Sequence, residues 1–415
     1  MDKVVFLSGT TRGATLEGIG RSLADSFREC GLECLEISLL DGRNLLENIR
    51  SIPFEQVRFV FSWVSMGMDL VGNGANGRVF NLWRELRVPF LCLHGDSPAY
   101  FFDRHVVPGD NFVSLYGFDE HMVLRKRLPG LCGVMGSVFP MVLDPMVQAE
   151  VDVQARKRGT LLFLKNGKDP ARLRRLWKSC LDTFLLSSML EMACHLERHL
   201  DDGTCDQVDD VVMAYFRERG FDLEHQVKTR LFFVAQLDDY VRAEKSTRMA
   251  EALREMPVEI RGNDWGHVDF RGGRATYIDE CDYSKSIGLI RSSLGLIDMS
   301  PNTVSKPHDR MMRAFGSYSA CLTNRQQWVE ELPHAARLMF QFQKESIQDR
   351  VAYVLAHRDE ALEMGMEMAE AYRQRHPSAQ LVQQLLDYAS LARLSQMSKR
   401  PEGSQDFFVW PPAKV

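Results

Sequence analysis

Short apolar blocks separated by amphipathic stretches run through the first 145 residues and predict buried strands covered by helices. The blocks predicted to be strands are 4–7, 34–37, 57–63 and 89–94. The helices predicted between them are 18–30 and 79–86. Strands that are apolar on both faces and alternate with helices are typical of a parallel, doubly wound α/β sheet. Ligands bind such sheets beyond the carboxyl ends of the strands, so site residues are expected there.

The same pattern returns after a connection at 140–145, with a long helical interruption. A strand is predicted at 159–164, and amphipathic helices with little β signal follow from 169 to 256. Further strands are predicted at 258–260, 276–278, 294–299 and 319–323. Residues 329–397 are again helical in pattern. The chain therefore shows the α/β pattern twice, the second time with a helical insertion.

Length, charge and cysteine content restrict the class of protein. At 415 residues the chain is too long for one ordinary core, so at least two domains are expected. A formal net charge of -5 gives no overall attraction for nucleic acid, so an anionic ligand must be bound by a local cluster of cations. The nine cysteines show no zinc spacing and predict reduced thiols. Without a signal peptide or an apolar run of about 20 residues, we expect a cytoplasmic protein without an integral membrane segment.

The most specific chemical signal lies where a late apolar run gives way to a polar loop. That loop and the start of the next predicted helix contain the polar candidates Ser300, Asn302, His308, Asp309 and Arg310. Unpaired N–H groups and the dipole at a helix N-terminus attract anions, and an arginine there adds a planar fork for a phosphate. This layout predicts half of a site for a nucleoside diphosphate.

With Tyr283 before the strand and a small-residue helix after the loop, this order resembles the donor-binding half of the nucleotide-sugar glycosyltransferases of the GT-B fold. The resemblance is to the branch of the bacterial spore-maturation proteins and group 1 glycosyl transferases. It implies two Rossmann-like domains facing a cleft, with a helical C-terminus. The implied parts are an acceptor domain at 1–145, a nucleotide-sugar domain at 146–385 with the helical segment 169–256, and a segment at 386–415 that crosses back to the first domain.

The resemblance also implies an activity. The expected reaction transfers a sugar from a nucleoside diphosphate donor to a hydroxyl of an acceptor, which would be a protein, a surface glycan or a metabolite. No cofactor is implied, because the nucleotide sugar is a co-substrate. The residues expected to bind the donor through this region are Tyr283, Ser300, Asn302, His308, Asp309 and Arg310.

Two positions depart from the family's pattern. Arg313 stands where many relatives have a glutamate that holds the ribose hydroxyls, and Tyr318 stands where they have glycine. The ribose contact, and with it the choice of donor, is therefore open. The alternative for the whole stretch is an ordinary Rossmann-like half that binds no nucleotide.

A second cation-bearing segment follows the first strand of the second domain. Lys165, Asn166 and Gly167 come directly after a run that should be buried. A flexible ammonium and backbone amides freed by a glycine are what a diphosphate requires, so these residues are expected to contact the donor's phosphates. The alternative is an ordinary loop with solvated charges.

Gly262 and Trp265 close the predicted strand 258–260, in a segment that the family also has. Gly262 permits a backbone turn, and Trp265 offers a flat apolar face that could flank the base of the donor. For Trp265 the alternative is packing in the core.

The first domain should supply the catalytic base. His94 and Asp96 stand at and just beyond the end of the strand 89–94, in a segment that resembles the Asp-x-Pro loop of the same branch. A carboxylate or imidazole there would deprotonate the acceptor as the sugar leaves. Asp96 is the first candidate and His94 the second. The alternative is that Asp96 caps a following helix.

The second half has no carboxylate pair at a strand end, so transfer without a metal ion is expected, with a helix end and basic side chains stabilising the departing diphosphate. Two other functions stay open. A binding protein that kept the scaffold and lost catalysis would account for Arg313. An NAD-dependent oxidoreductase is disfavoured because the loop from Gly9 to Gly13 lacks the GxGxxG pattern.

Overall fold

The computed structural model describes residues 2–9, 15–42, 44–74, 77–130, 133–201, 207–280, 283–397 and 407–409. Most of the predicted glycine loop, residues 10–13, lies outside these ranges. The chain forms two compact units: unit 1 contains residues 1–141 and 376–415, and unit 2 contains residues 142–375. The family resemblance implies divisions at 145 and 385. The return to unit 1 comes earlier because Pro377 separates two helices that read as one run, and the residue before a proline is biased away from helix.

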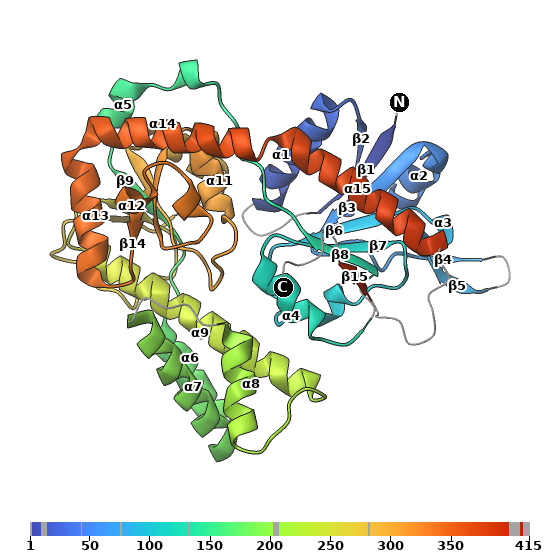
Figure 1. Cartoon of the computed structure of the whole chain (residues 1–415), viewed down its shortest axis with the longest axis horizontal. Coiled ribbons are helices and arrows are strands. Elements are labelled where there is room, and N and C mark those ends of the chain that lie inside the picture. The colour runs from blue at the N-terminus through green and yellow to red at the C-terminus, as the bar shows by residue number, and fades with distance from the viewer. Residues whose placement is uncertain are drawn as a thin grey trace. The chain divides into compact units, whose positions relative to one another are not determined.

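A parallel sheet forms the centre of unit 1, in the order β2-β1-β3-β6-β7-β8-β15 (Figure 1). Its strands are β1 (Lys3–Ser8), β2 (Glu33–Ser38), β3 (Val57–Trp63), β6 (Phe90–His94), β7 (Phe112–Tyr116), β8 (Gly133–Ser137) and β15 (Phe407–Val409). Its helices are α1 (Thr15–Glu29), α2 (Leu45–Arg50), α3 (Leu82–Leu86), α4 (Asp119–Lys126) and α15 (Ser378–Met397). Phe27 and Leu385 share one buried cluster with Phe59, while Trp83 and Phe112 share another. The strands are therefore apolar on both faces, as the sequence predicts.

The segment 79–86, predicted as one helix, is a strand followed by a short helix. β4 (Val71–Asn73) and β5 (Val79–Asn81) form an antiparallel hairpin, and α3 begins only at Leu82. The Asn81 side chain accepts a hydrogen bond from the Arg84 amide at 3.1 Å. The helix prediction is wrong for the first three residues because Asn81 is an N-cap, which stops the helix from extending backwards.

The sheet of unit 2 is also parallel, in the order β11-β10-β9-β12-β13-β14. Its strands are β9 (Leu161–Leu164), β10 (Glu259–Arg261), β11 (Thr276–Ile278), β12 (Gly295–Ile297), β13 (Ala320–Asn324) and β14 (Met339–Phe340). Its helices outside the insertion are α5 (Val153–Arg158), α10 (Tyr283–Ser292), α11 (Asp309–Gly316), α12 (Ala335–Leu338), α13 (Lys344–Ala356) and α14 (Arg358–Arg375). The strand order reverses between β9 and β12, which is where a sheet of this kind binds its ligand.

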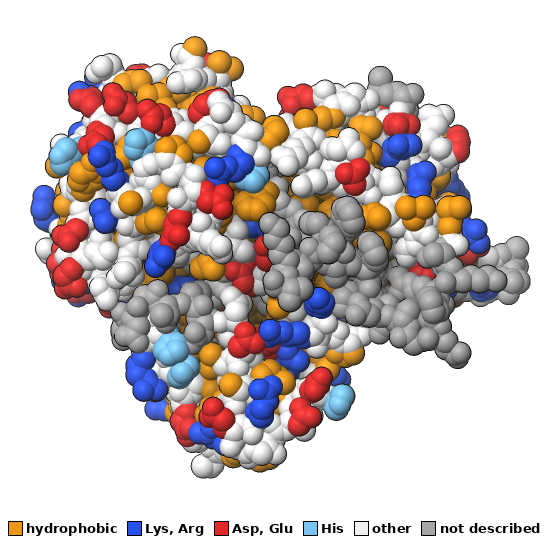
Figure 2. Space-filling model, viewed as in Figure 1, with side chains coloured by type: hydrophobic (Ala, Val, Ile, Leu, Met, Phe, Trp, Pro, Cys, Tyr) orange, Lys and Arg blue, Asp and Glu red, His pale blue; other side chains and the backbone are white. Residues whose placement is uncertain are grey.

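The predicted helical insertion consists of α6 (Pro170–Cys180), α7 (Thr183–Asp201), α8 (Val208–Glu218) and α9 (Val227–Leu253). These helices pack on one another beside the sheet of unit 2 (Figure 1). A buried ion pair joins α8 to α9, with Arg230 Nη2 2.6 Å from Asp209 Oδ2. On the face in view, acidic and basic side chains are interspersed (Figure 2), in keeping with the small net charge. No helix in the described part of the chain is long and apolar enough to cross a membrane.

Candidate functional site

The candidate residues of unit 2 meet where its strand order reverses. Lys165 follows β9 directly, and Ser300 lies in the loop that follows the neighbouring strand β12. Arg310 lies in the first turn of α11, the helix after that loop. Because the carboxyl ends of parallel strands share one edge of the sheet, residues far apart in sequence are brought to a single place.

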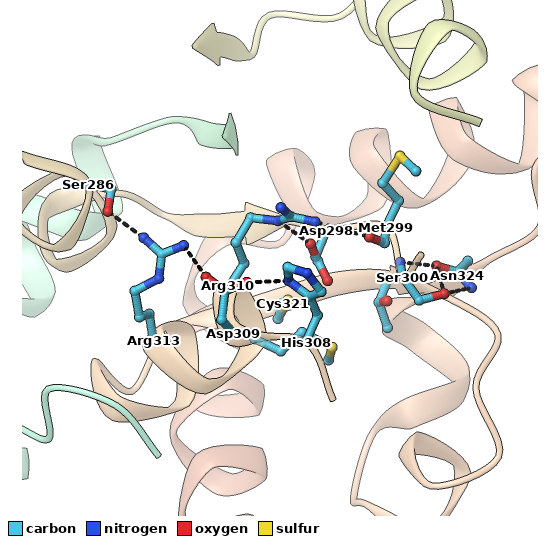
Figure 3. A network of polar contacts seen from close by, with 12 residues as sticks. Ser286, Asp298, Met299, Ser300, His308, Asp309, Arg310, Arg313, Cys321 and Asn324 are labelled. Carbon is cyan, nitrogen blue, oxygen red and sulfur yellow. Dashed lines mark hydrogen bonds and ion pairs between the residues drawn. The ribbon is translucent and has the colours of Figure 1, made fainter. Parts of the chain in front are cut away.

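Arg310 is fixed at the start of α11 by a buried ion pair (Figure 3). Its Nε donates to Asp298 Oδ1 at 2.6 Å, and its Nη2 donates to Met299 O at 3.2 Å. The Arg310 side chain is 11% exposed and that of Asp298 is 0% exposed. Burial by itself would lower the pKa of Arg310, but the charges of Asp298 and Asp309 raise it. The arginine therefore stays charged, and Asp298 sets the direction of its fork.

Lys165 is a second cation at the same edge. Its ammonium makes no ion pair or hydrogen bond within the described ranges. Burial, followed by the nearby charges of Arg310 and Arg242, lowers the pKa of Lys165 from 10.5 to about 7. A cation that is destabilised by burial and by other cations is stabilised by an anion placed beside it. This pair of cations can therefore bind a phosphate group.

Asp309 is held as a carboxylate by the basic groups around it (Figure 3). His308 Nδ1 contacts its Oδ1, and Arg313 Nη2 donates to its Oδ2 at 2.8 Å. Burial alone would raise the pKa of Asp309, but His308, Arg313 and Arg310 bring it well below the usual range. Arg313 also donates to Ser286 Oγ on α10. Arg313, at the family's glutamate position, thus ties α11 to α10.

The two polar side chains of the predicted loop hold the loop itself. Ser300 Oγ and its amide both contact Asn324 Oδ1, at 3.1 and 2.8 Å. Asn302 Nδ2 donates to Asp238 Oδ1 at 2.7 Å on α9. Both residues are buried. Their described contacts shape the loop that also carries Asp298, the partner of Arg310.

The amide of Gly167 itself is used within the loops of unit 2. Gly167 N donates to Asn263 O at 2.8 Å, so this amide is already paired. Asn166 Oδ1 accepts from the Asn263 amide at 3.0 Å. A Cβ on Gly167 would lie 2.6 Å from Asp264 O, so the glycine is required by close packing of the two loops. Within 165–167, Lys165 and the exposed Asn166 stay candidates for contact with a phosphate, while Gly167 packs the loops.

Gly262 and Trp265 have packing roles in the same loops. Gly262 has φ +150°, and a Cβ there would lie 2.0 Å from Lys165 O. Trp265 is 1% exposed, and its Nε1 donates to Lys165 O at 2.8 Å. A ring buried this deeply has no face left for a base, which favours the core-packing alternative. Through this bond Trp265 positions the backbone of Lys165.

Of the two tyrosines singled out by the resemblance, only Tyr318 has a described side chain. Tyr283 begins α10, but its side chain lies outside the described part of the structure. Tyr318 has φ 55°, a left-handed conformation that favours glycine, the residue that the resemblance implies at this position. The Arg373 guanidinium lies 4.0 Å from the centre of its ring, and Nη1 donates to its hydroxyl at 2.8 Å. These contacts hold Tyr318 in a conformation that its side chain alone disfavours.

Sequence reasoning missed two basic residues of α9. Arg242 contributes to the low pKa of Lys165, and its Nη1 lies 3.7 Å from Asp238 Oδ2. Lys245 is buried, with Nζ 3.5 Å from Pro301 O. Residues three apart lie on the same face of a helix, so the spacing of Arg242 and Lys245 could have indicated a basic face on this long helix. Nothing in the sequence indicated which face would meet the loop after β12.

In unit 1, His94 and Asp96 have opposite surroundings. His94 ends β6, is 1% exposed and stacks on His105 with ring centroids 4.0 Å apart. Burial and neighbouring cations lower its pKa to about 3, so the imidazole is neutral. Asp96 is exposed in a bend. No helix begins directly after Asp96. The hydrogen bond to the following turn comes instead from Ser97, whose Oγ accepts from the Ala99 amide at 3.3 Å. The helix-cap alternative therefore does not hold, and Asp96 is the accessible group.

Comparisons with known proteins give a fold and a family match over part of the chain. The family model described as glycosyl transferase-like matches residues 242–387. A comparison with curated proteins gave no match. The T4 phage β-glucosyltransferase BGT in complex with UDP-glucose is similar at a TM-score of 0.52 and 10% identity, covering 93% of this chain and 99% of that one. The structure of the same enzyme with UDP and Mn2+ has a TM-score of 0.51 and 10% identity, and the match covers 93% of this chain and 100% of that one.

A third solved structure, Anabaena Alr3699/HepE in complex with UDP and glucose, gives a TM-score of 0.49 at 9% identity, covering 94% of this chain and 100% of that one. The family match spans the end of α9, the loop after β12 and all of α11, which carry most of the candidate donor site. The chain therefore has the GT-B fold, and its residues 242–387 match the model of the glycosyl transferase-like family.

Proposed function

We propose that the chain is a glycosyltransferase that moves a sugar from a nucleoside diphosphate donor to a hydroxyl of an acceptor. The observation that carries this proposal is the pair of cations Lys165 and Arg310 at the reversal point of the sheet of unit 2. The match of residues 242–387 to the glycosyl transferase-like family supports it. Because T4 phage BGT binds UDP-glucose on a similar fold, UDP sugars are the first donors to test.

In this proposal, unit 2 stabilises the leaving group and unit 1 activates the acceptor. Lys165, Arg310 and the amides at the start of α11 bind the diphosphate, whose negative charge grows as the bond to the sugar breaks. Asp96 accepts the proton of the acceptor hydroxyl as its oxygen attacks the sugar. Asp298 and Trp265 do not contact the donor. Asp298 positions the side chain of Arg310, and Trp265 positions the backbone of Lys165. No cofactor takes part.

The direct test is stabilisation of the protein by nucleotide sugars. A donor present at 100 times its dissociation constant should raise the free energy of unfolding by about 2.7 kcal/mol. Thermal melts with a panel of UDP, GDP, ADP and dTDP sugars measure this, and release of the free nucleoside diphosphate then reports transfer or hydrolysis. A panel in which no donor shifts the melt, at concentrations of several millimolar, would contradict the proposal.

Donor binding should weaken as the pH rises above about 7. Free Lys165 has a pKa of about 7, and a bound anion favours its ammonium form, so binding raises that pKa and takes up a proton. Affinity then falls by up to about tenfold per pH unit between the free and the bound pKa. Calorimetry of a nucleotide sugar between pH 6 and 9 measures the slope. Lys165→Met should bind weakly at every pH and show no slope, and an unchanged slope in that variant would exclude Lys165.

Transfer should need no divalent metal, because Lys165 and Arg310 supply positive charge at the leaving group. Within the described ranges, no group of three or more His, Cys, Asp or Glu side chains is placed to hold a metal ion. The measurement is the transfer rate before and after treatment with EDTA. Since T4 phage BGT has been observed with Mn2+, manganese is the ion to add back. Loss of turnover in EDTA that manganese restores would refute this expectation.

A further inference from the structure

A polar groove on unit 1 lies away from the candidate site residues of that unit. Its volume is about 520 Å³. It is lined by β5 and the residue before it, by α3 and its C-cap, by the segment before β7 and by Gln396 of α15. The lining contains three arginines, Arg78, Arg84 and Arg87, and two carboxylates, Glu85 and Asp110. The groove is therefore a candidate site for an anion.

The position of the groove separates it from the proposed chemistry. Arg87 comes shortly before β6 and Asp110 shortly before β7, so the groove lies at the amino ends of these strands. His94 and Asp96 stand at the opposite end of β6. At about 3.3 Å per residue, the strand separates the two ends by about 13 Å. A group bound in the groove cannot reach the atoms that react near Asp96.

The backbone and the aliphatic stem of Arg84 have defined contacts beside the groove. Its amide is fixed by the Asn81 side chain at 3.1 Å. Its aliphatic stem lies over Gly109, where an added Cβ would come 3.4 Å from the Arg84 Cγ and Cδ atoms. Its guanidinium makes no ion pair within the described ranges. An arginine without a carboxylate partner is able to bind an anionic group from outside the chain.

Arg87 occupies a backbone position that does not suit it. It ends α3 with φ 53°, in the left-handed region where glycine or asparagine is usual. Strained positions of this kind cluster at functional sites, where a particular side chain is needed despite the conformation. The Arg87 guanidinium likewise has no ion pair in the described structure, and it lines the groove. Arg87 therefore places a second guanidinium at the groove.

We infer that this groove binds an oxyanion, a phosphate or carboxylate group, on a ligand other than the sugar donor. Arg84 and Arg87 provide planar forks that match either group through paired hydrogen bonds. Val79, which is 63% exposed, and Phe80 give the rest of the ligand an apolar surface. Glu85 and Asp110 offset part of the positive charge, so binding should be selective and sensitive to salt. This inference does not depend on the proposed function.

The test is calorimetric titration of the full chain at low ionic strength with pyrophosphate and, separately, with citrate. The native protein is compared with Arg84→Ala and Arg87→Gly, and with Arg50→Ala as a control at an exposed arginine of α2 in the same unit. Pyrophosphate also has a proposed site in unit 2, which all four proteins retain unchanged. The result is therefore read from the difference between variants.

Both groove variants should bind at least one of the two anions about ten- to a hundredfold more weakly, as expected for the loss of a charged hydrogen bond. Arg50→Ala should match the native protein. Weakening with pyrophosphate alone identifies a phosphate, and weakening with citrate identifies a carboxylate. Arg87→Gly relieves the left-handed conformation, so it should melt no lower than the native protein, which separates lost binding from unfolding. Equal titrations in all four proteins would overturn the inference.

Discussion

Replacement of Asp96 by asparagine should slow sugar transfer by about 10²–10⁴-fold, the usual effect of removing a positioned general base. Asp96 is exposed two residues beyond the end of β6, and the amide of Asp96→Asn keeps its size but cannot accept the proton. The donor-binding cations lie in the other unit and are untouched, so the affinity for a nucleotide sugar should not change. Single-turnover transfer rates and calorimetry measure the two quantities separately.

The matched control for this prediction is Asp103→Asn, an exposed aspartate further along the same connection. It should leave transfer unchanged. His94 is buried with a pKa of about 3, so His94→Ala should lower stability through lost stacking on His105. Near-normal transfer by Asp96→Asn together with loss of transfer in a folded His94→Ala protein would move the role of base to His94.

Replacement of Arg310 by alanine should have two large effects at once. It leaves the Asp298 carboxylate buried and unpaired, and Oδ2 of Asp298 already has no hydrogen-bond partner among the residues that the structure describes. Breaking one side of a buried pair typically lowers the free energy of unfolding by about 3–5 kcal/mol. Loss of the fork should also weaken nucleotide binding by about 1.5–3 kcal/mol. Chemical denaturation and calorimetry measure these effects.

A double variant, Arg310→Ala with Asp298→Asn, separates stability from binding. It removes the unpaired charge, so most of the lost stability should return while nucleotide affinity stays low. Arg274→Ala, at an exposed arginine of the same unit, is the control for a general loss of positive charge. If the double variant bound nucleotide as tightly as the native protein, the start of α11 would not be the phosphate site.

Strand and helix positions follow from the sequence wherever burial alone determines them. Val57–Trp63 and Thr276–Ile278 have the predicted bounds, because each is a short run of strand-forming residues. The insertion is predicted as helical because its apolar residues recur with the helical period over several turns. The prediction is wrong at 79–81, where a single N-capping asparagine outweighs a helical pattern too short to decide.

The candidate site could be predicted only in part, because side-chain partners depend on tertiary contacts. Lys165 and Arg310 were found from their places after a strand and at a helix start. The pairing of Arg310 with Asp298 and the approach of Arg242 were not, because each joins elements whose contact no local pattern encodes. For Trp265 the sequence left two roles open, because an aromatic residue near a glycine suits a ligand site and a core equally well. Its burial in the structure favours the core.

Unit 1 is assembled from both ends of the chain, which affects how the protein folds during synthesis. Leu385 and Tyr388 of α15 belong to the same buried cluster as Phe59 and Phe61 of β3. The ribosome makes α15 after all of unit 2, which is one uninterrupted segment and can fold as it emerges. Until then the nascent sheet of unit 1 keeps an uncovered apolar face, the kind of surface that chaperones bind and that otherwise leads to aggregation.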